Sequence, residues 1–210
     1  MLTKLFGSQS RVKILKLFLF NSDQRFYIRQ VARKLDLQVN SARRELENLR
    51  ELGLLLVGDK EPSKEADNKK NKKKIQEKYY YADKDFVLFG ELRSLMAKAQ
   101  VLYKKDFLES IKQIGNPRLV ILSGLFVNNN RSPVDLLIVG RTEKKKTRQV
   151  IERLEKDLGA EVNFTVMSTQ EFKYRSDITD IFLYNILETK NIVVIDKLGI
   201  NKGKQERGGE

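Results

Sequence analysis

Two residue types that carry much of protein chemistry are missing from this chain. The 210 residues include no cysteine and no histidine. Without cysteine the chain can form no disulfide and offers no thiolate, which is compatible with a cytoplasmic location. Without histidine it lacks the commonest general base and metal ligand. Any catalysis would therefore depend on carboxylates, hydroxyls, lysine or arginine.

Long apolar runs are missing as well. No stretch approaches the ~18–20 apolar residues that a membrane-spanning helix needs, so we expect no membrane partner. The N-terminal segment has no small-residue cleavage site and is interrupted by Lys13 and Lys16, which favours an amphipathic helix over a signal peptide. With 40% hydrophobic and 33% charged residues, the composition is typical of a globular protein with one large or two small domains.

Positive charge dominates what is present. The formal net charge is +13 and the isoelectric point is about 9.8. Residues 1–85 hold 20 Lys and Arg against 12 Asp and Glu, whereas residues 86–210 hold 21 against 16. The excess per residue is therefore denser in the first part, as expected of a region that meets phosphates. A general contribution to solubility is the alternative explanation.

Apolar residues at helical spacing predict three helices before Gly53. The first follows Ser8 or Ser10, either of which could cap it, and ends at residues 21–23. Residues 36–38 form the turn between the second and third helices, and Gly53 ends the third. The residues expected on the buried faces are Val12, Ile14, Leu15, Leu17, Phe18 and Leu19 in the first helix, Ile28, Val31, Ala32 and Leu35 in the second, and Ala42, Leu46, Leu49 and Leu52 in the third.

A β-hairpin with a lysine-rich loop is predicted next. Leu54–Val57 and Lys78–Ala82 are short apolar or aromatic runs of strand length. The segment between them has no apolar periodicity, and Asn68–Lys74 has five lysines in seven positions, so we expect this tip to be disordered without a partner. Alternation along the second strand turns one or two of the tyrosines at 79–81 inward, and stacking on bases is an alternative role for them.

The residues YIRQVARKLDLQVNSARRELENLRELGLL and KYYYADKDF, at 27–55 and 78–86, resemble the winged helix-turn-helix of bacterial and archaeal transcription regulators such as the ArsR and MarR families. The resemblance implies double-stranded DNA binding, with the third helix in the major groove and the lysine loop as a wing. Asn40, Arg43 and Arg44 would read bases, because Arg can bond guanine and Asn adenine through two hydrogen bonds. The full set of DNA-binding candidates is Gln38, Val39, Asn40, Ser41, Arg43, Arg44, Lys60, Lys69, Lys70, Lys72, Lys73, Lys74 and Lys78.

Each of these assignments has a structural alternative. Arg43 and Arg44 could be solvent charges, with Glu47 balancing Arg43 one helical turn away. Gln38 and Ser41 could cap the helix or touch a phosphate. The lysines would supply affinity rather than sequence choice, or the loop could be a solvated insertion.

After residue 85 the pattern is first helical and then alternates between strands and helices. Residues 86–114 predict a long helix, broken near Gln100, within a helical connector of residues 86–116 that packs between two domains or makes a two-fold contact. Residues 115–117 predict the domain boundary. Beyond it we expect strands at Leu119–Phe126, Val134–Val139, Glu161–Met167 and Ile192–Ile195, helices at Thr147–Leu158 and Thr169–Lys190, and a flexible tail over residues 198–210.

The segment RLVILSGLFVNNNRSPVDLLIVGR, residues 118–141, resembles the core of minimal nucleotidyltransferase domains. In that family a Gly-Ser turn holds the triphosphate, and two aspartates hold the metal ions for phosphoryl transfer. This chain has Ser123-Gly124-Leu125 at the turn and Pro133 where the first aspartate belongs, which leaves Asp135, with Glu161 as the remaining carboxylate. The resemblance implies the fold, whereas the missing aspartate favours a domain with no metal, no cofactor and no catalytic residue.

The polar residues of this segment leave two interpretations open. Asp135 could simply hydrogen-bond the loop of residues 127–132. Alternatively, Ser123, Gly124, Ser132 and Asp135 could line a cleft that senses a nucleotide or another small-molecule effector. The basic run Arg141–Arg148 could favour an anion at the next helix N-terminus, or it could be a solvated helix face.

The sequence thus predicts an α+β or α/β protein of two domains. Residues 1–85 would form a winged helix of three helices and a β-hairpin wing, residues 86–116 a helical connector, and residues 117–197 a nucleotidyltransferase-like mixed sheet with flanking helices. The predicted function is a sequence-specific DNA-binding transcriptional regulator whose second domain serves dimerisation or ligand sensing, and a homodimer would match a palindromic site. The alternatives are an active nucleotidyltransferase targeted by a winged helix and a winged helix that binds RNA or protein.

Overall fold

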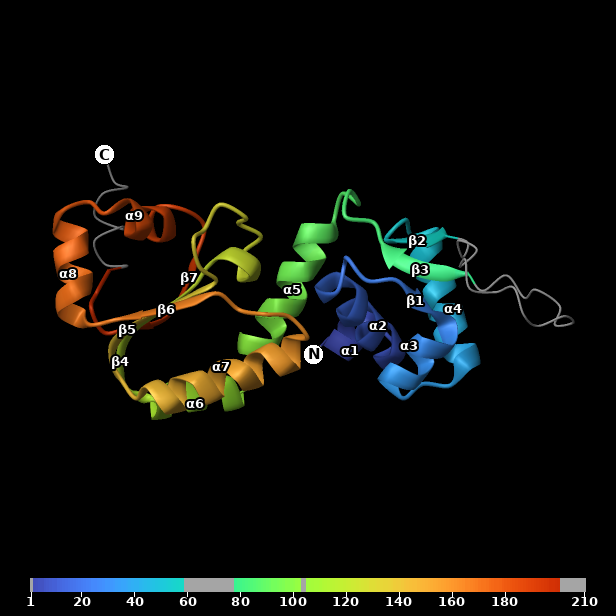
Figure 1. Ribbon diagram of the computed structural model, residues 1–210, viewed down its shortest axis with the longest axis horizontal. Helices are drawn as coiled ribbons and strands as arrows, with labels where there is room; N and C mark the ends of the chain where they lie inside the picture. Colours follow the sequence, from blue (N-terminus) through green and yellow to red (C-terminus); the bar gives the residue numbers. More distant parts are fainter. Residues whose placement is uncertain (1, 59–77, 103–104, 201–210) are drawn as a thin grey trace, which may run out of the picture. The chain divides into compact units, whose positions relative to one another are not determined.

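The chain forms two compact units, residues 1–89 and residues 90–210, each built from helices and one β-sheet (Figure 1). The computed structural model describes residues 2–58, 78–102 and 105–200. The mixed helix and strand content confirms the prediction of a two-domain α+β protein. Within the described ranges, no helix is both long and apolar enough to cross a membrane.

The first unit places a short antiparallel sheet beside a group of helices. In the sheet β1 pairs with β3, and β3 pairs with β2. The sheet order is therefore β1-β3-β2, so the segment directly before the second predicted helix pairs with the hairpin. The elements are α1 Leu2–Phe6, α2 Gln9–Phe20, β1 Phe26–Tyr27, α3 Ile28–Leu35, α4 Val39–Glu51, β2 Leu55–Gly58 and β3 Tyr79–Ala82.

Local signals in the sequence set the ends of these helices. Ser8 caps α2, since its side-chain oxygen accepts a hydrogen bond from the Arg11 N–H at 3.1 Å. At the end of α4, Gly53 has φ 88°, and the N–H groups of Gly53 and Leu54 reach back to the carbonyls of Arg50 and Leu49 at 2.9 and 3.0 Å. This is the Schellman arrangement, which satisfies the last carbonyls of a helix.

The buried face of each helix follows the predicted spacing with four corrections. Leu52 was expected to point inward but is 57% exposed, because the left-handed turn at Gly53 gives the buried position to Leu54 instead. Val12, Ile28 and Leu35 are only half-buried. The completely buried residues include Ile14 and Phe18 of α2, Val31 of α3, and Ala42 and Leu46 of α4.

A largely buried carboxylate ties α4 to the start of α2. Ser8 Oγ donates to Glu45 Oε1 at 2.6 Å, and Arg11 Nε donates to Glu45 Oε2 at 2.9 Å. Burial acts to raise the pKa of Glu45, but the hydrogen bonds from Ser8 and Arg11 outweigh it, so the pKa lies below its usual value. The ionised carboxylate therefore stabilises this unit.

Replacing Glu45 with alanine is expected to lower the free energy of unfolding by about 1–3 kcal/mol at pH 7, because it removes two hydrogen bonds to a charged group. Since the folded pKa is depressed, this stabilisation is present above the unfolded pKa of about 4.3 and is lost as pH falls through the folded pKa. Urea unfolding at pH 7, 5 and 3 measures it. Glu51→Ala, at an exposed position of the same helix, is the control. A gap between Glu45→Ala and wild type that stays constant down to pH 3 would contradict the assignment.

The second unit is a four-stranded mixed sheet in the order β6-β5-β4-β7. β5 and β6 are parallel and are joined by α7, whereas β4 is antiparallel to both β5 and β7. Figure 1 shows α8 and α9 on one side of the sheet and α6 and α7 on the other. The elements are α5 Phe89–Leu102, α6 Lys105–Gln113, β4 Gly115–Leu122, the 3-10 turn η1 Gly124–Phe126, β5 Leu136–Thr142, α7 Lys144–Leu158, β6 Phe164–Met167, α8 Thr169–Asp177, α9 Ile181–Leu187 and β7 Ile192–Asp196.

The structure corrects several predicted boundaries in this half. The division between the units falls at Phe89 and Gly90, and residues 115–117 pair with β5 as the start of β4 instead of forming a linker. The predicted break of the helical connector near Gln100 is confirmed, since α5 ends at Leu102 and α6 begins at Lys105, but residues 90–116 belong to the second unit instead of linking two domains. Of the predicted tail, residues 198–200 lie in this unit and residues 201–210 lie outside the described residues.

Four predicted elements also change their limits. The strand expected over residues 119–126 ends at Leu122, because Gly124 at φ +46° begins the 3-10 turn. The strand expected from Glu161 begins at Phe164, and the strand expected from Val134 begins at Leu136. The helix expected over residues 169–190 is two helices, since Thr179 adopts φ 54° between them.

Candidate functional site

The turn before α4 and the first turns of α4 expose polar and basic side chains. Ala42, Leu46 and Leu49 are buried and anchor the opposite face of the helix. Gln38 stands at the N-cap position but its side chain makes no capping hydrogen bond. Ser41 is half-buried, and its Oγ lies 3.5 Å from Ser10 Oγ, so this hydroxyl faces α2. The predicted residues that are exposed here are Gln38, Val39, Asn40, Arg43 and Arg44.

Glu47 does not balance Arg43 as the structural alternative supposed. Its carboxylate accepts from Arg50 Nε at 2.8 Å and pairs with that guanidinium. It also lies beside the Tyr80 hydroxyl, where burial and then the Glu47 charge raise the pKa of Tyr80. In the described part of the chain no carboxylate forms an ion pair with Arg43 or Arg44. Both guanidinium groups are therefore available to a partner.

The lysines of the predicted wing are mostly beyond what the structure describes. Lys78, directly before β3, is exposed. The predicted strand began at Lys78, whereas β3 begins one residue later, at Tyr79. The candidates Lys60, Lys69, Lys70, Lys72, Lys73 and Lys74 lie outside the described residues.

A second basic surface, not predicted from the sequence, lies where α3 meets β1. Arg25, Phe26, Gln30, Arg33 and Lys34 line a hollow of about 310 Å³. None of these lining residues is acidic, and Lys34 Nζ lies 5.4 Å from the centre of the Phe26 ring. Arg25, Arg33 and Lys34 are exposed, so their positive charges face solvent together. This α3–β1 hollow is suited to an anion such as a phosphate.

Arg25 also joins the outer face of the three-stranded sheet. Its guanidinium carbon lies 4.9 Å from the centre of the Tyr79 ring and 5.6 Å from that of Tyr81, and Nη1 donates to the Tyr79 hydroxyl at 3.0 Å. Tyr80 alone of the three tyrosines is buried, which confirms that one or two of them pack inward. The contact of Arg25 with Tyr79 and Tyr81 was not predicted, because a strand as short as β1 shows no alternation of apolar and polar residues in the sequence. The pairing Phe26↔Tyr80 became visible only in the fold.

In the second unit, the serines of the predicted ligand cleft bond to each other. Ser123 is completely buried, and its Oγ donates to Ser132 Oγ at 2.7 Å. Ser132 Oγ in turn donates to the Val134 carbonyl at 2.8 Å. These hydroxyls close the loop between β4 and β5.

The Asp135 carboxylate is engaged by main-chain groups on both sides. Its Oδ1 accepts from the Leu125 N–H at 2.6 Å, and its Oδ2 accepts from the Asn163 N–H at 3.0 Å. A Cβ on Gly124 would lie 2.2 Å from Oδ1, so the glycine permits this close approach. Asp135 thus joins the 3-10 turn to the segment before β6 through hydrogen bonds. This favours a structural role for Asp135 over a role in ligand binding.

The carboxylates do not assemble into a metal-binding group. Glu161 is exposed and precedes β6 instead of lying on it. Among the residues that the structure describes, no group of three acidic side chains could hold a metal ion. The basic run Arg141–Arg148 is exposed apart from Thr142 and Thr147, and Lys146 and Arg148 pair with Glu143 and Glu152 at 2.7 and 3.1 Å. For these two residues the pairing favours a solvated helix face.

No family model matches this chain, and no curated protein matches it. Its function is therefore inferred from its own side chains. The strongest feature is the exposed face of α4, where two arginines and an asparagine stand together without an acidic partner in the described part of the chain.

Proposed function

We propose that this protein is a sequence-specific regulator of transcription that binds double-stranded DNA through a winged helix-turn-helix in residues 1–89. The observation that carries the proposal is the front of α4. Arg43 and Arg44 are exposed there beside Asn40, while Glu47, the carboxylate that could have neutralised them, pairs with Arg50. Arginine and asparagine at the start of a helix are the side chains best suited to base edges in the major groove.

The topology of the first unit supports this reading. A strand lies between α2 and α3, and a hairpin follows α4, so that β1 adds to the hairpin in the order β1-β3-β2. In a winged helix-turn-helix the hairpin lies beside the recognition helix. With α4 in the major groove, Lys78 and the lysines of residues 60–74 would then meet the phosphate backbone.

The α3–β1 hollow extends the proposed phosphate contacts. Arg25, Arg33 and Lys34 line it without an acidic neighbour among the lining residues. Contacts of this kind position a protein on DNA and add affinity, but they do not select a sequence. The base-reading role therefore stays with α4.

For the second unit we propose an inactive nucleotidyltransferase-like domain that serves dimerisation or ligand sensing. The β4–β5 hairpin followed by a parallel β6 is compatible with that fold. Pro133 stands where the family has its first metal-binding aspartate, and the Asp135 carboxylate accepts two main-chain hydrogen bonds. A single aspartate committed in this way is poorly placed to hold the metal ions of phosphoryl transfer.

Selection of bound sequences from a random duplex library, at two salt concentrations, tests the proposal. We expect an enriched motif, palindromic if a homodimer binds. Tight binding at low salt that enriches no motif would show a general electrostatic anchor instead. Failure to bind duplex DNA at either salt concentration would contradict the proposal, and binding to RNA alone would favour the RNA-binding alternative.

Replacing Arg33 with glutamine is expected to weaken DNA binding by a similar factor on every sequence. Because one phosphate contact is lost, the slope of log Kobs against log salt should become shallower by about 0.9. Fluorescence anisotropy on a selected duplex and a random duplex measures this. Arg148→Gln removes an exposed arginine of the second unit and serves as the control. An unchanged slope would exclude the hollow from the DNA contact.

A further inference from the structure

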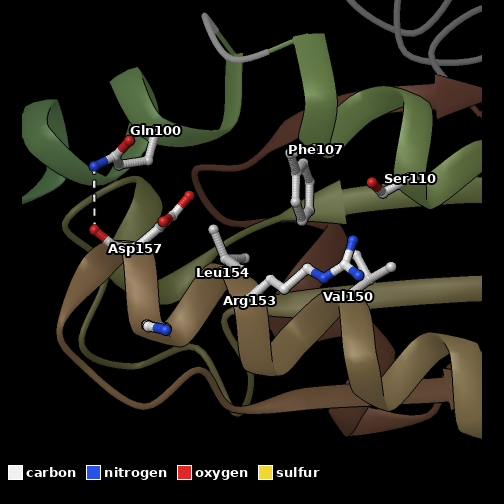
Figure 2. A pocket seen from close by; sticks show the side chains of 8 residues that line it. Gln100, Phe107, Ser110, Val150, Arg153, Leu154 and Asp157 are labelled. Atoms are coloured by element: carbon white, nitrogen blue, oxygen red, sulfur yellow. Dashed lines mark hydrogen bonds between the residues drawn. The ribbon is translucent and has the colours of Figure 1, made fainter.

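A hollow of about 330 Å³ lies in the second unit between α6 and α7, below the end of α5 (Figure 2). It is separate from the Ser123–Asp135 segment that the sequence singled out. Its volume is at the lower end of the range for small-molecule sites. An adjoining hollow of about 200 Å³ shares Ser110, Val150 and Arg153 with it, so the space continues along the two helices. We call the pair the α6–α7 hollow.

The floor of the α6–α7 hollow is apolar. Phe107 projects from α6, and Val150 and Leu154 come from α7 one turn apart (Figure 2). These residues are between 4% and 9% exposed, and their exposed atoms line the hollow. An apolar ligand body that covered them would be favoured by about 25 cal/mol for each Å² removed from water.

One end of the hollow is held by a hydrogen bond between helices. Gln100 of α5 is 7% exposed, and its Nε2 donates to the main-chain carbonyl of Asp157 in α7 at 3.1 Å (Figure 2). A buried amide that links two helices gives this wall a definite position. This hydrogen bond therefore holds the wall between α5 and α7 in place without a ligand.

Arg153 provides a charged group at the edge of this floor. Its side chain extends from α7 along the side of the hollow that faces Phe107 and Ser110 of α6 (Figure 2). It is exposed, and within the described ranges no ion pair or hydrogen bond engages its guanidinium. Arg148 on the same helix is also exposed but pairs with Glu152 at 3.1 Å. The fold thus supplies a carboxylate partner to Arg148 but, among the described residues, none to Arg153.

We propose that the α6–α7 hollow is a binding site for a small amphiphilic carboxylate. The apolar body would lie against Phe107, Val150 and Leu154. The carboxylate would accept two hydrogen bonds from the planar guanidinium of Arg153. Ser110 lines the same space, and its hydroxyl would be a further donor. Asp157 also lines the hollow, but among the described lining residues Arg153 and Lys156 outnumber it and favour an anion. This site goes beyond the proposed DNA binding and does not depend on it.

A titration of the full chain followed by ¹H–¹⁵N NMR tests the site with two matched probes, 1-naphthoate and the neutral 1-naphthalenemethanol. We expect saturable shifts of the main-chain amides in residues 107–114 and 150–157 with both probes. Arg153→Gln should weaken naphthoate binding about five- to tenfold, because it removes a charge-assisted hydrogen-bonded contact whose strength is reduced by its exposure to solvent. The same variant should change naphthalenemethanol binding less than about twofold, because that probe carries no charge. Arg148→Gln should leave both affinities as in wild type.

Three results would overturn the proposal. The first is shifts that do not saturate or that fall outside the two helices. The second is equal naphthoate affinity in Arg153→Gln and Arg148→Gln. The third is an equal loss of both probes in Arg153→Gln, which would mean that the substitution disturbed the floor instead of removing an anion contact. Since Arg153 is exposed, the variant should fold, and its spectrum without ligand verifies this.

Discussion

Replacing both Arg43 and Arg44 with alanine should remove most of the preference for a selected DNA sequence over a random one. Each arginine that forms two hydrogen bonds with a guanine contributes about 1–3 kcal/mol of discrimination. The loss is therefore roughly five- to hundredfold per residue in the ratio of specific to non-specific affinity. The effect is large because neither guanidinium has a carboxylate partner in the described structure that would compete with DNA.

The measurement is anisotropy on the selected duplex and on a random duplex of equal length. Arg43→Lys and Arg44→Lys are the matched controls, because lysine keeps the charge but cannot form the planar pair of hydrogen bonds. We expect the lysine variants to retain binding to random DNA and to lose the sequence preference. The alanine variants should lose affinity for both duplexes and more for the selected one. An equal loss on both duplexes would mean that the arginines act only through charge.

Replacing Asp135 with alanine is the second substitution for which we expect a large effect, a loss of about 3–5 kcal/mol in the stability of residues 90–210. The substitution removes two hydrogen bonds to a charged carboxylate, from the N–H groups of Leu125 and Asn163, each worth about 1.5–3 kcal/mol. The lower part of their sum applies, because water can replace the acceptor of the exposed Asn163 N–H. It also releases the 3-10 turn from the segment before β6. Hydrogen exchange of β5 and β6 peptides, with increasing urea, measures the stability of this unit separately from the first.

Glu161→Ala is the control for Asp135→Ala, since Glu161 is exposed and should change stability by less than about 0.5 kcal/mol. If Asp135 instead served a ligand and not the fold, Asp135→Ala would leave the exchange rates of β5 and β6 unchanged. Transfer of label from a nucleoside triphosphate by the wild-type chain, with Mg²⁺ or Mn²⁺, would contradict the proposal that this domain is inactive.

The α3–β1 hollow and the front of α4 show different degrees of predictability. Ala42, Leu46 and Leu49 recur at helical spacing, and this recurrence alone turned Asn40, Arg43 and Arg44 outward. No such pattern relates Arg25 to Tyr79, because they are far apart in sequence and meet only when β1 pairs with β3. The sequence around a basic residue that precedes a short strand does not indicate which residues it will contact in the fold.

The sequence by itself determined features that depend on near neighbours along the chain. Helical periodicity set most of the buried faces, and Ser8 and Gly53 set helix ends. The helix predicted to end at Leu158 ends there as α7, followed by Gly159 at φ 76°. These outcomes follow from backbone conformation and from spacing over one or two turns.

Only the tertiary structure decided which polar groups found partners. Glu47 could have paired with Arg43 or Arg50, which lie one turn to either side of it in α4, and in the fold its carboxylate pairs with Arg50 beside the Tyr80 hydroxyl. Asp135 could have faced a ligand, but in the fold its carboxylate accepts hydrogen bonds from two main-chain N–H groups of other segments. Within the described residues, the same packing left Arg153 without an ion-pair partner beside an apolar floor, while Arg148 pairs with Glu152. Partner choice depends on the approach of elements far apart in the chain, because a hydrogen bond or ion pair acts over a few ångströms and sequence distance does not specify that separation.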